Sequence, residues 1–199
     1  MDGLNRRQAL QALATGAIGA ATSSIWVESL TAFARQQAHA HAADAVIALQ
    51  NWTPRVLTAR QNEAVVTLTE LILPQTETPG AKAAGVNRFV DAVLGDARPA
   101  DRDSFLRGLA WMDERSRALF GKDFLAASAT EQTALLTRLS KDGNPDGEDR
   151  IGVEFFQAIK AMTINGYYTT EIGLRQELGD DGQLFLAQFP GCSHPEHQG

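Results

Sequence analysis

The sequence predicts an all-α protein, a compact single-domain helical bundle with extended N- and C-terminal segments. Apolar residues recur at helical spacing in several stretches, and two of these stretches begin with a capping-box pattern. No stretch alternates apolar and polar residues for long enough to indicate a strand. The chain has 199 residues, 44% of them hydrophobic, which is enough for one domain with a real core. We expect roughly five or six helices in this bundle.

Residues 1–42 are expected to form a twin-arginine export signal and leader, ahead of a helical domain over residues 43–199. The basic pair Arg6-Arg7 precedes an Ala/Gly-rich apolar run, a pattern typical of such signals. The run is too short and too interrupted for a spanning helix. The alternative is an amphipathic first helix of the domain. Twin-arginine signals export folded proteins, so the first interpretation predicts a periplasmic location.

The first helix of the domain is predicted to begin at Thr58, because Thr58 and Gln61 match a capping box. Its apolar face comprises Ala64, Val65, Leu68, Leu71 and Ile72, whereas Glu63, Thr67 and Glu70 are expected to face away. Pro74 predicts the end of this helix. A further helical segment is expected after it, with Thr78 as N-cap, Pro79 at the first helical position and Gly85 just past the end.

Three more helices are predicted before residue 142. The first carries Val86, Phe89, Val90 and Val93 and stops near Gly95. The second runs from about residue 101 to residue 120, with core candidates Phe105, Leu109, Met112 and Leu119. The third begins at the capping box of Ser128 and Glu131, presents Leu135, Leu136 and Leu139, and ends near Lys141.

The stretch Ile151–Gly173 is predicted to contain the buried central helix, which runs into GYYTTEIG, residues 166–173. Its apolar stripe comprises Phe155, Phe156, Ile159, Met162, Thr163 and Gly166. Tyr167 and Tyr168 follow, and adjacent residues of a helix point about 100° apart, so the two rings do not share one core face. Tyrosine is a frequent anchor at protein interfaces. The sequence leaves open whether this pair belongs to the core or to an interface.

Residues 142–149, DGNPDGED, match the first half of a calcium-binding loop, with Asp or Asn at positions one, three and five and Gly at six. The match then fails, because position twelve is Val153, which has no carboxylate. A turn rich in Asp, Asn, Gly and Pro between two helices has the same composition. Both interpretations stay open, and the turn is the simpler one.

The C-terminal tail holds the only cysteine, Cys192, together with His194 and His197. These three side chains are good metal ligands, but a closed zinc site needs a fourth. A lone cysteine in an exported protein also suits a disulfide to another chain. We expect Cys192 to lie at an interface, in a disulfide or beside the two histidines at a metal; the alternative is a plain tail.

The composition excludes several classes of function. The net charge of −6 does not suit a nucleic-acid binder, which presents basic patches. All four histidines lie near the two ends of the chain, which leaves the domain body without the histidines of triads and most zinc sites. No dinucleotide-binding glycine motif, P-loop or nucleophile elbow is present. No catalytic residues are predicted in this chain, which favours a partner subunit.

Two stretches carry a family resemblance. Residues 57–94, and most specifically LILPQTETPGAKAAGV at residues 71–86 within them, resemble the gluconate 2-dehydrogenase subunit 3 family. So do NGYYTTEIG, residues 165–173, and the twin-arginine leader. The ending FPGCSHPEHQG resembles small subunits that pair with flavin-dependent glycoside 3-dehydrogenases. The resemblance implies a non-catalytic small subunit of an oxidoreductase complex in the periplasm.

The partner implied by this resemblance is a large catalytic flavoprotein of the glucose-methanol-choline type, in a heterodimer or larger complex. FAD is then bound by the partner and no cofactor by this chain, and a cytochrome c is a candidate electron acceptor. The expected partner interface comprises Tyr167, Tyr168, Glu171, Phe189, Cys192, His194 and His197. The alternative function is a free-standing metal-binding or scaffold protein of the cell envelope.

Overall fold

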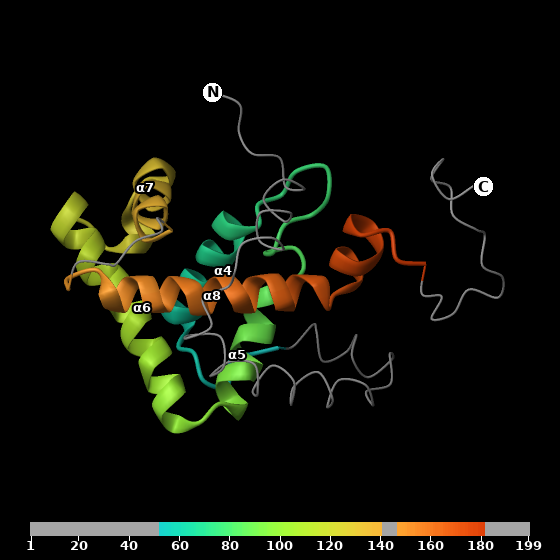
Figure 1. Cartoon of the computed structure of the whole chain (residues 1–199), viewed down its shortest axis with the longest axis horizontal. Helices are drawn as coiled ribbons and strands as arrows, with labels where there is room; N and C mark the ends of the chain where they lie inside the picture. The colour runs from blue at the N-terminus through green and yellow to red at the C-terminus, as the bar shows by residue number, and fades with distance from the viewer. Residues whose placement is uncertain (1–51, 141–146, 182–199) are drawn as a thin grey trace, which may run out of the picture.

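A computed structural model describes residues 52–140 and 147–181 of the chain. These residues form five α-helices and contain no strand, so the all-α prediction is confirmed. The helices are α4 (Ala59–Ile72), α5 (Val86–Asp96), α6 (Pro99–Phe120), α7 (Ala129–Leu139) and α8 (Arg150–Tyr168). Two shorter elements are the 3-10 helix η1 (Phe124–Ala126) and the π-helix η2 (Ile172–Glu177). Figure 1 shows α8 lying across the molecule, with α7 toward one end and η2 beyond the other.

Two helices begin at the capping boxes that the sequence predicts. At the start of α4, the Thr58 side chain accepts a hydrogen bond from the backbone N of Gln61, and the Gln61 side chain accepts one from the backbone N of Thr58 at 2.9 Å. Ser128 and Glu131 form the same reciprocal pair at the start of α7. These bonds satisfy N–H groups that the first turn of a helix leaves without a backbone partner.

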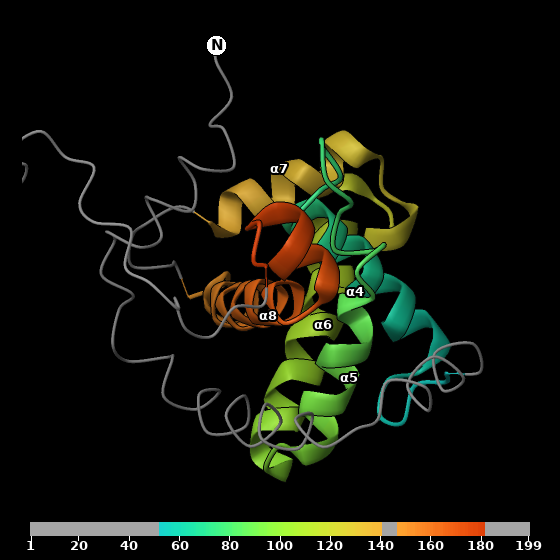
Figure 2. The ribbon, with the colours of Figure 1, turned by 90° about the vertical axis from the view of Figure 1, so that its right-hand side faces the viewer.

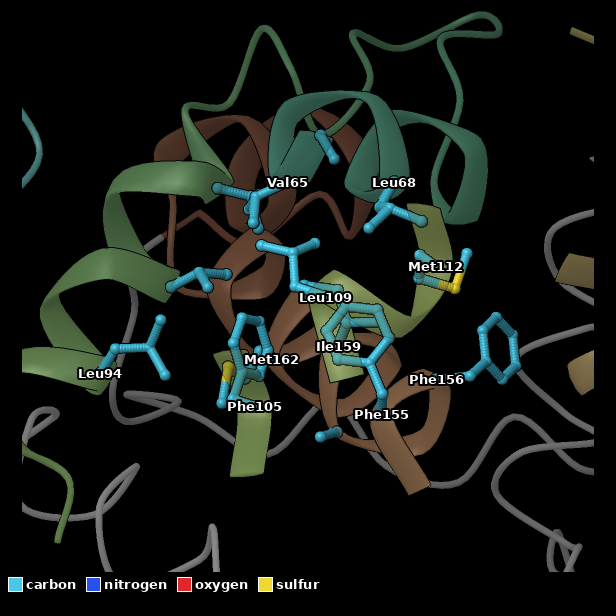
Figure 3. Packing of buried hydrophobic residues seen from close by; sticks show 14 of the residues in the cluster. Val65, Leu68, Leu94, Phe105, Leu109, Met112, Phe155, Phe156, Ile159 and Met162 are labelled. Atoms are coloured by element: carbon cyan, nitrogen blue, oxygen red, sulfur yellow. The ribbon is translucent and has the colours of Figure 1, made fainter. Parts of the chain in front are cut away.

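The central helix of the fold is α8, which packs against α4, α5, α6 and α7. Its predicted stripe is buried, including Phe155, Ile159, Met162 and Gly166. Figure 3 shows how this stripe meets apolar side chains of α4 and α6, and Figure 2 shows α4, α5 and α6 on one side of α8. Among the described residues, no helix is both long enough and apolar enough to cross a membrane.

Helices α6 and α8 cross closely because each contributes a glycine to the crossing. A Cβ at Gly108 of α6 would lie 2.4 Å from Cβ of Phe155, and a Cβ at Gly152 of α8 would lie 2.1 Å from the ring of Trp111. Both distances are far below van der Waals contact, so any larger side chain forces the helices apart. The close approach lets Phe105 and Phe155 pack edge to face, with ring centroids 5.0 Å apart.

The start of the described domain is held by a buried carboxylate. Asp91 of α5 is 1% exposed, and its oxygens accept hydrogen bonds from the backbone N of Arg55, Val56 and Leu57 at 2.8, 3.0 and 2.9 Å. Three N–H donors compensate much of the cost of burying the charge. Asp91 therefore fixes the segment that leads into α4 against the side of α5.

Two expectations from the sequence are wrong in detail, the helix before Gly85 and the burial of Leu119. Residues 78–85 form turns instead of a helix, and Gly85, with φ of 69°, is the residue from which α5 begins. The central helix runs into the stretch 166–173 as the sequence predicts; it ends there at Tyr168, and the chain continues as a π-helix. Leu119, a predicted core residue of α6, is 42% exposed because no described element covers the last turn of that helix on this side.

Candidate partner interface

The loop between α4 and α5 folds around the carboxylate of Glu70. Glu70 Oε1 accepts a hydrogen bond from the backbone N of Gln75 at 2.9 Å, and Oε2 accepts one from the backbone N of Lys82 at 2.8 Å. Gly80 lets the chain pass close beside it, because a Cβ there would lie 2.6 Å from the backbone N of Gln75 and 2.5 Å from both carboxylate oxygens. Glu70 thus ties residues 74–82 into one unit, named here the latch loop. The sequence predicts Glu70 to face away; its side chain turns to the loop instead.

The latch loop is joined to the end of α8 and to η2. The hydroxyl of Tyr167 donates a hydrogen bond to the carbonyl oxygen of Pro79 at 2.7 Å. The hydroxyl of Thr78 donates one to the carboxylate of Glu177 in η2. The stretches 71–86 and 165–173, which carry the family resemblance, therefore meet in space. Together the latch loop and residues 167–178 form what we call the latch end of the molecule, at the η2 side of Figure 1.

The chain turns sharply between α8 and η2, and Gly173 makes this turn sterically feasible. A Cβ at Gly173 would lie 2.1 Å from the carbonyl oxygen of Tyr167. The hydroxyl of Thr170 donates to that same oxygen at 2.6 Å and accepts a hydrogen bond from the backbone N of Gly173 at 3.1 Å. The backbone N of Leu178 then donates to the carbonyl of Gly173 at 3.1 Å, the five-residue spacing of a π-helix. The last glycine of NGYYTTEIG, Gly173, is thus explained by the space that this turn leaves.

The two adjacent tyrosines have different surroundings. Tyr167 has no exposed surface, so in this chain it is a core residue. Tyr168 packs edge to face on Tyr167, with ring centroids 5.2 Å apart, and keeps part of its surface exposed. Glu171 is exposed and lies 3.5 Å from the guanidinium of Arg175. Of the predicted interface residues, Tyr168 and Glu171 therefore keep exposed surface at the latch end, and Tyr167 is buried with its ring against that of Tyr168.

Other predicted site residues lie outside the described ranges, namely Arg6, Arg7, Phe189, Cys192, His194 and His197. Within residues 52–140 and 147–181, no group of three His, Cys, Asp or Glu side chains is arranged to hold a metal ion. Most of the predicted calcium-like loop also falls outside, at residues 141–146. Its last residue, Asp149, lies between Arg115 and Arg138 at 3.0 and 2.5 Å, so this carboxylate is engaged by two guanidinium groups.

A second charged network joins α4, α6 and η1 on the surface. Arg60 contacts Asp113 and Asp123 at 3.0 and 2.8 Å, and Arg117 donates a hydrogen bond to Asp123. The hydrogen bond from Arg117 holds the pKa of Asp123 below its ordinary value, and the charge of Arg60 acts in the same direction. The pKa of Arg60 is raised, chiefly by its hydrogen bond to Asp113. The network holds α4 beside the end of α6.

A family model described as gluconate 2-dehydrogenase subunit 3 matches residues 59–182. The chain belongs to this family. The match covers every described element from α4 to η2 and includes both stretches that form the latch end. No curated protein and no solved structure gives a significant match. As a member of a subunit family, the protein is an accessory subunit of a dehydrogenase complex.

In this gluconate 2-dehydrogenase subunit 3 protein, the latch end depends on residues that the sequence reasoning missed. Glu70, Gly80 and Glu177 carry the contacts that shape it. The turn-forming pair Pro79-Gly80 was the available signal, because Gly after Pro favours a turn over a helix. No local pattern marks Glu70 or Glu177, since each bonds a segment distant in sequence.

Proposed function

We propose that this chain is the non-catalytic small subunit of a periplasmic, FAD-dependent sugar or glycoside dehydrogenase of the glucose-methanol-choline type. It stabilises the folded catalytic subunit and carries that subunit across the membrane through its own twin-arginine signal. The catalytic subunit binds FAD, and a cytochrome c accepts the electrons. The observation that carries this proposal is the family match over residues 59–182.

The mechanism of this chain is binding. A rigid surface loses less conformational entropy when a partner docks than a loose one does. The latch end has this property, because Tyr167 and Thr78 join its loop to its helix by hydrogen bonds and Glu70 closes the loop from within. Tyr168 then supplies an aromatic surface and Glu171 a charged neighbour. Such a mixture of an aromatic anchor with polar surroundings is typical of interfaces.

Export supplies the second part of the function. The pair Arg6-Arg7 precedes an apolar run at the start of the chain. A system that exports folded proteins carries a bound partner together with the signal-bearing chain. One leader on the small subunit is then sufficient for both subunits.

The experiment is co-expression of this chain with its catalytic subunit, followed by separation of periplasm and cytoplasm. We expect both proteins, with the flavin, in the periplasm, and both in the cytoplasm when Arg6 and Arg7 are changed to Lys. The lysine pair keeps the positive charge, so it serves as a matched test of arginine recognition. Normal periplasmic levels of the catalytic subunit without this chain, or with the lysine variant, would contradict shared export.

A further inference from the structure

The side of α8 that faces away from the core carries a line of uncharged residues, named here the outer stripe. It comprises Val153, Gln157, Ala161 and Ile164. Their spacing of four, four and three residues places them on one face of the helix. None of the four is buried, and the buried stripe through Ile159 lies on the opposite side. Tyr168 continues the same line into the latch end.

The outer stripe differs from the other long helix surface of this molecule. A helix face in contact with water normally carries charged side chains. The exposed positions of α6 follow this rule, with Asp103, Arg107, Glu114 and Arg117. On α8, charged residues only border the outer stripe, at Glu154 and Lys160. The stripe therefore suits contact with an apolar segment, because covering its valine, alanine and isoleucine removes apolar surface from water.

The C-terminal tail leaves the described part of the fold beside one end of this line. At the turn into η2, a Cβ on Gly173 would lie 2.9 Å from Cα of Tyr168, so the backbones of the two residues are in contact. The backbone N of Asp180 donates a hydrogen bond to the carbonyl oxygen of Leu174 at 3.0 Å, which keeps the end of η2 next to that turn. The tail therefore begins close to Tyr168, one helical turn from Ile164.

The first part of the tail has the composition and the length to cover the outer stripe. Residues 183–189, QLFLAQF, have no charged side chain and four large apolar ones, and Gly182 and Pro190 bound the segment. Seven extended residues span about 23 Å. The distance along α8 from Tyr168 back to Val153 is about 22 Å, at 1.5 Å for each residue. The segment can therefore follow the line from its start to its far end.

The leader also has apolar residues before Trp52, but it joins the fold on another side. Asp91 of α5 holds residues 55–57 through three backbone hydrogen bonds. The side chains of Asp91 and Phe89 point about 160° apart on α5, because successive residues of a helix turn by about 100°. Phe89 is the residue that meets α8, at Gly166. A segment that precedes Trp52 must therefore pass round α5 to reach α8, whereas the tail begins beside it.

We propose that residues 183–189 fold back over the outer stripe of α8, so that the chain encloses its own central helix. The inference concerns the isolated chain and does not depend on the proposed function. Phe189, expected from the sequence at the partner interface, is then part of the fold. The last ten residues, with Cys192, His194 and His197, and the surface of Tyr168 stay available to a partner.

The test measures the melting temperature of the isolated full-length chain. Ile164→Lys places a charge on the outer stripe, and the paired change Phe185→Lys and Leu186→Lys places one on each side of an extended tail segment. We expect each variant to melt about 2–4 °C below the wild type. The variant that combines all three changes should melt no lower than the single ones, because the first charge already displaces the tail.

Matched controls add the same charges next to these positions. Asn165→Lys lies at an exposed position of α8 beside the outer stripe, and the paired change Ser193→Lys and Gln198→Lys lies in the tail beyond the segment. Both controls should melt as the wild type does. Losses in the controls as large as those in the variants would overturn the proposal.

Other occupants give different results, and each of them overturns the proposal. A wild-type melting temperature in either the Ile164→Lys variant or the tail variant shows that the tail does not cover the stripe. Losses that add in the combined variant show two independent sites. A loss that Ile164→Lys shares with Ile47→Lys assigns the stripe to the leader. An unchanged melting temperature of Ile164→Lys assigns the stripe to the catalytic subunit if binding of that purified subunit weakens, and to a second copy if a wild-type dimer becomes a monomer.

Discussion

The hydroxyl of Tyr167 donates a hydrogen bond to the carbonyl oxygen of Pro79, 2.7 Å away and 88 residues earlier in the chain. This single contact joins the two stretches that carry the family resemblance, both of which lie within the matched residues 59–182. It also explains why two adjacent tyrosines have different roles. Tyr167 is fully buried beneath the latch loop, whereas Tyr168 keeps part of its surface exposed.

Alanine substitutions should separate the two tyrosines. Tyr167→Ala removes a buried ring, so we expect the free energy of unfolding to fall by about 3–5 kcal/mol. Tyr168→Ala should leave the isolated subunit helical and weaken binding of the catalytic subunit about thirtyfold, the effect of losing an anchor worth about 2 kcal/mol. Urea titration and a binding assay measure the two effects. Equal loss of stability in both variants would place Tyr168 in the core as well.

Gly173→Ala should destabilise the turn into η2. The added Cβ would lie 2.1 Å from the carbonyl oxygen of Tyr167, a backbone atom that has little room to move. We expect a loss of about 1–3 kcal/mol in the free energy of unfolding, measured by urea titration. Gly147→Ala is the control, because nothing lies within 4 Å of the Cβ position there. Similar stability of the two variants would show that the turn is not sterically constrained.

Asp91→Ala should loosen the start of the domain. The change leaves the backbone N–H groups of residues 55–57 without their acceptor, and a buried donor without an acceptor costs about 1–3 kcal/mol. Faster proteolysis just before α4 should accompany the loss of stability. Asp96→Ala, at an exposed position of the same helix, is the control and should behave as wild type. Wild-type stability of Asp91→Ala would contradict the anchoring role.

The surface network around Asp123 should make the stability of the fold depend on pH in the acidic range. The pKa of Asp123 is lowered in the folded protein, chiefly by its hydrogen bond from Arg117, from a value of 3.8. The ionised carboxylate therefore stabilises the fold above that value, and this contribution is lost as the pH falls through the lower folded pKa. At neutral pH the melting temperature of the wild type should be higher than that of Asp123→Asn. The two melting temperatures should become equal as the pH is lowered. Asp103→Asn, at an exposed position outside the network, is the control. A difference in melting temperature between wild type and Asp123→Asn that stays the same at every pH would contradict the pairing.

The helices were predictable from the sequence because their signals are local. The capping boxes at Thr58 and Ser128 mark two helix starts, and the stripe through Ile159 identifies the buried face of α8. The contacts of Glu70 and Glu177 were not predictable, because each depends on a backbone segment or side chain that the fold brings near. The same contacts turn residues 78–85 away from the helix that Pro79 and Gly85 suggest.

The site was predictable only in part, for the same reason. Tyr167 and Tyr168 are indistinguishable by residue type, and the carbonyl of Pro79 decides which of them is buried. Leu119 fits the apolar period of α6, but periodicity does not reveal whether another element covers it. Exposure at that position follows from the place where α7 packs.

The central claim is that this chain is the binding subunit of a flavoprotein dehydrogenase. The most direct measurement is affinity purification of the tagged full-length chain from cells that also make its partner, followed by mass spectrometry and absorption spectroscopy. We expect one large co-purifying protein, a flavin spectrum, and sugar-dependent reduction of an artificial electron acceptor that the chain alone does not give. Purification of the chain without such a partner, or sugar-dependent reduction by the isolated chain, would contradict the account.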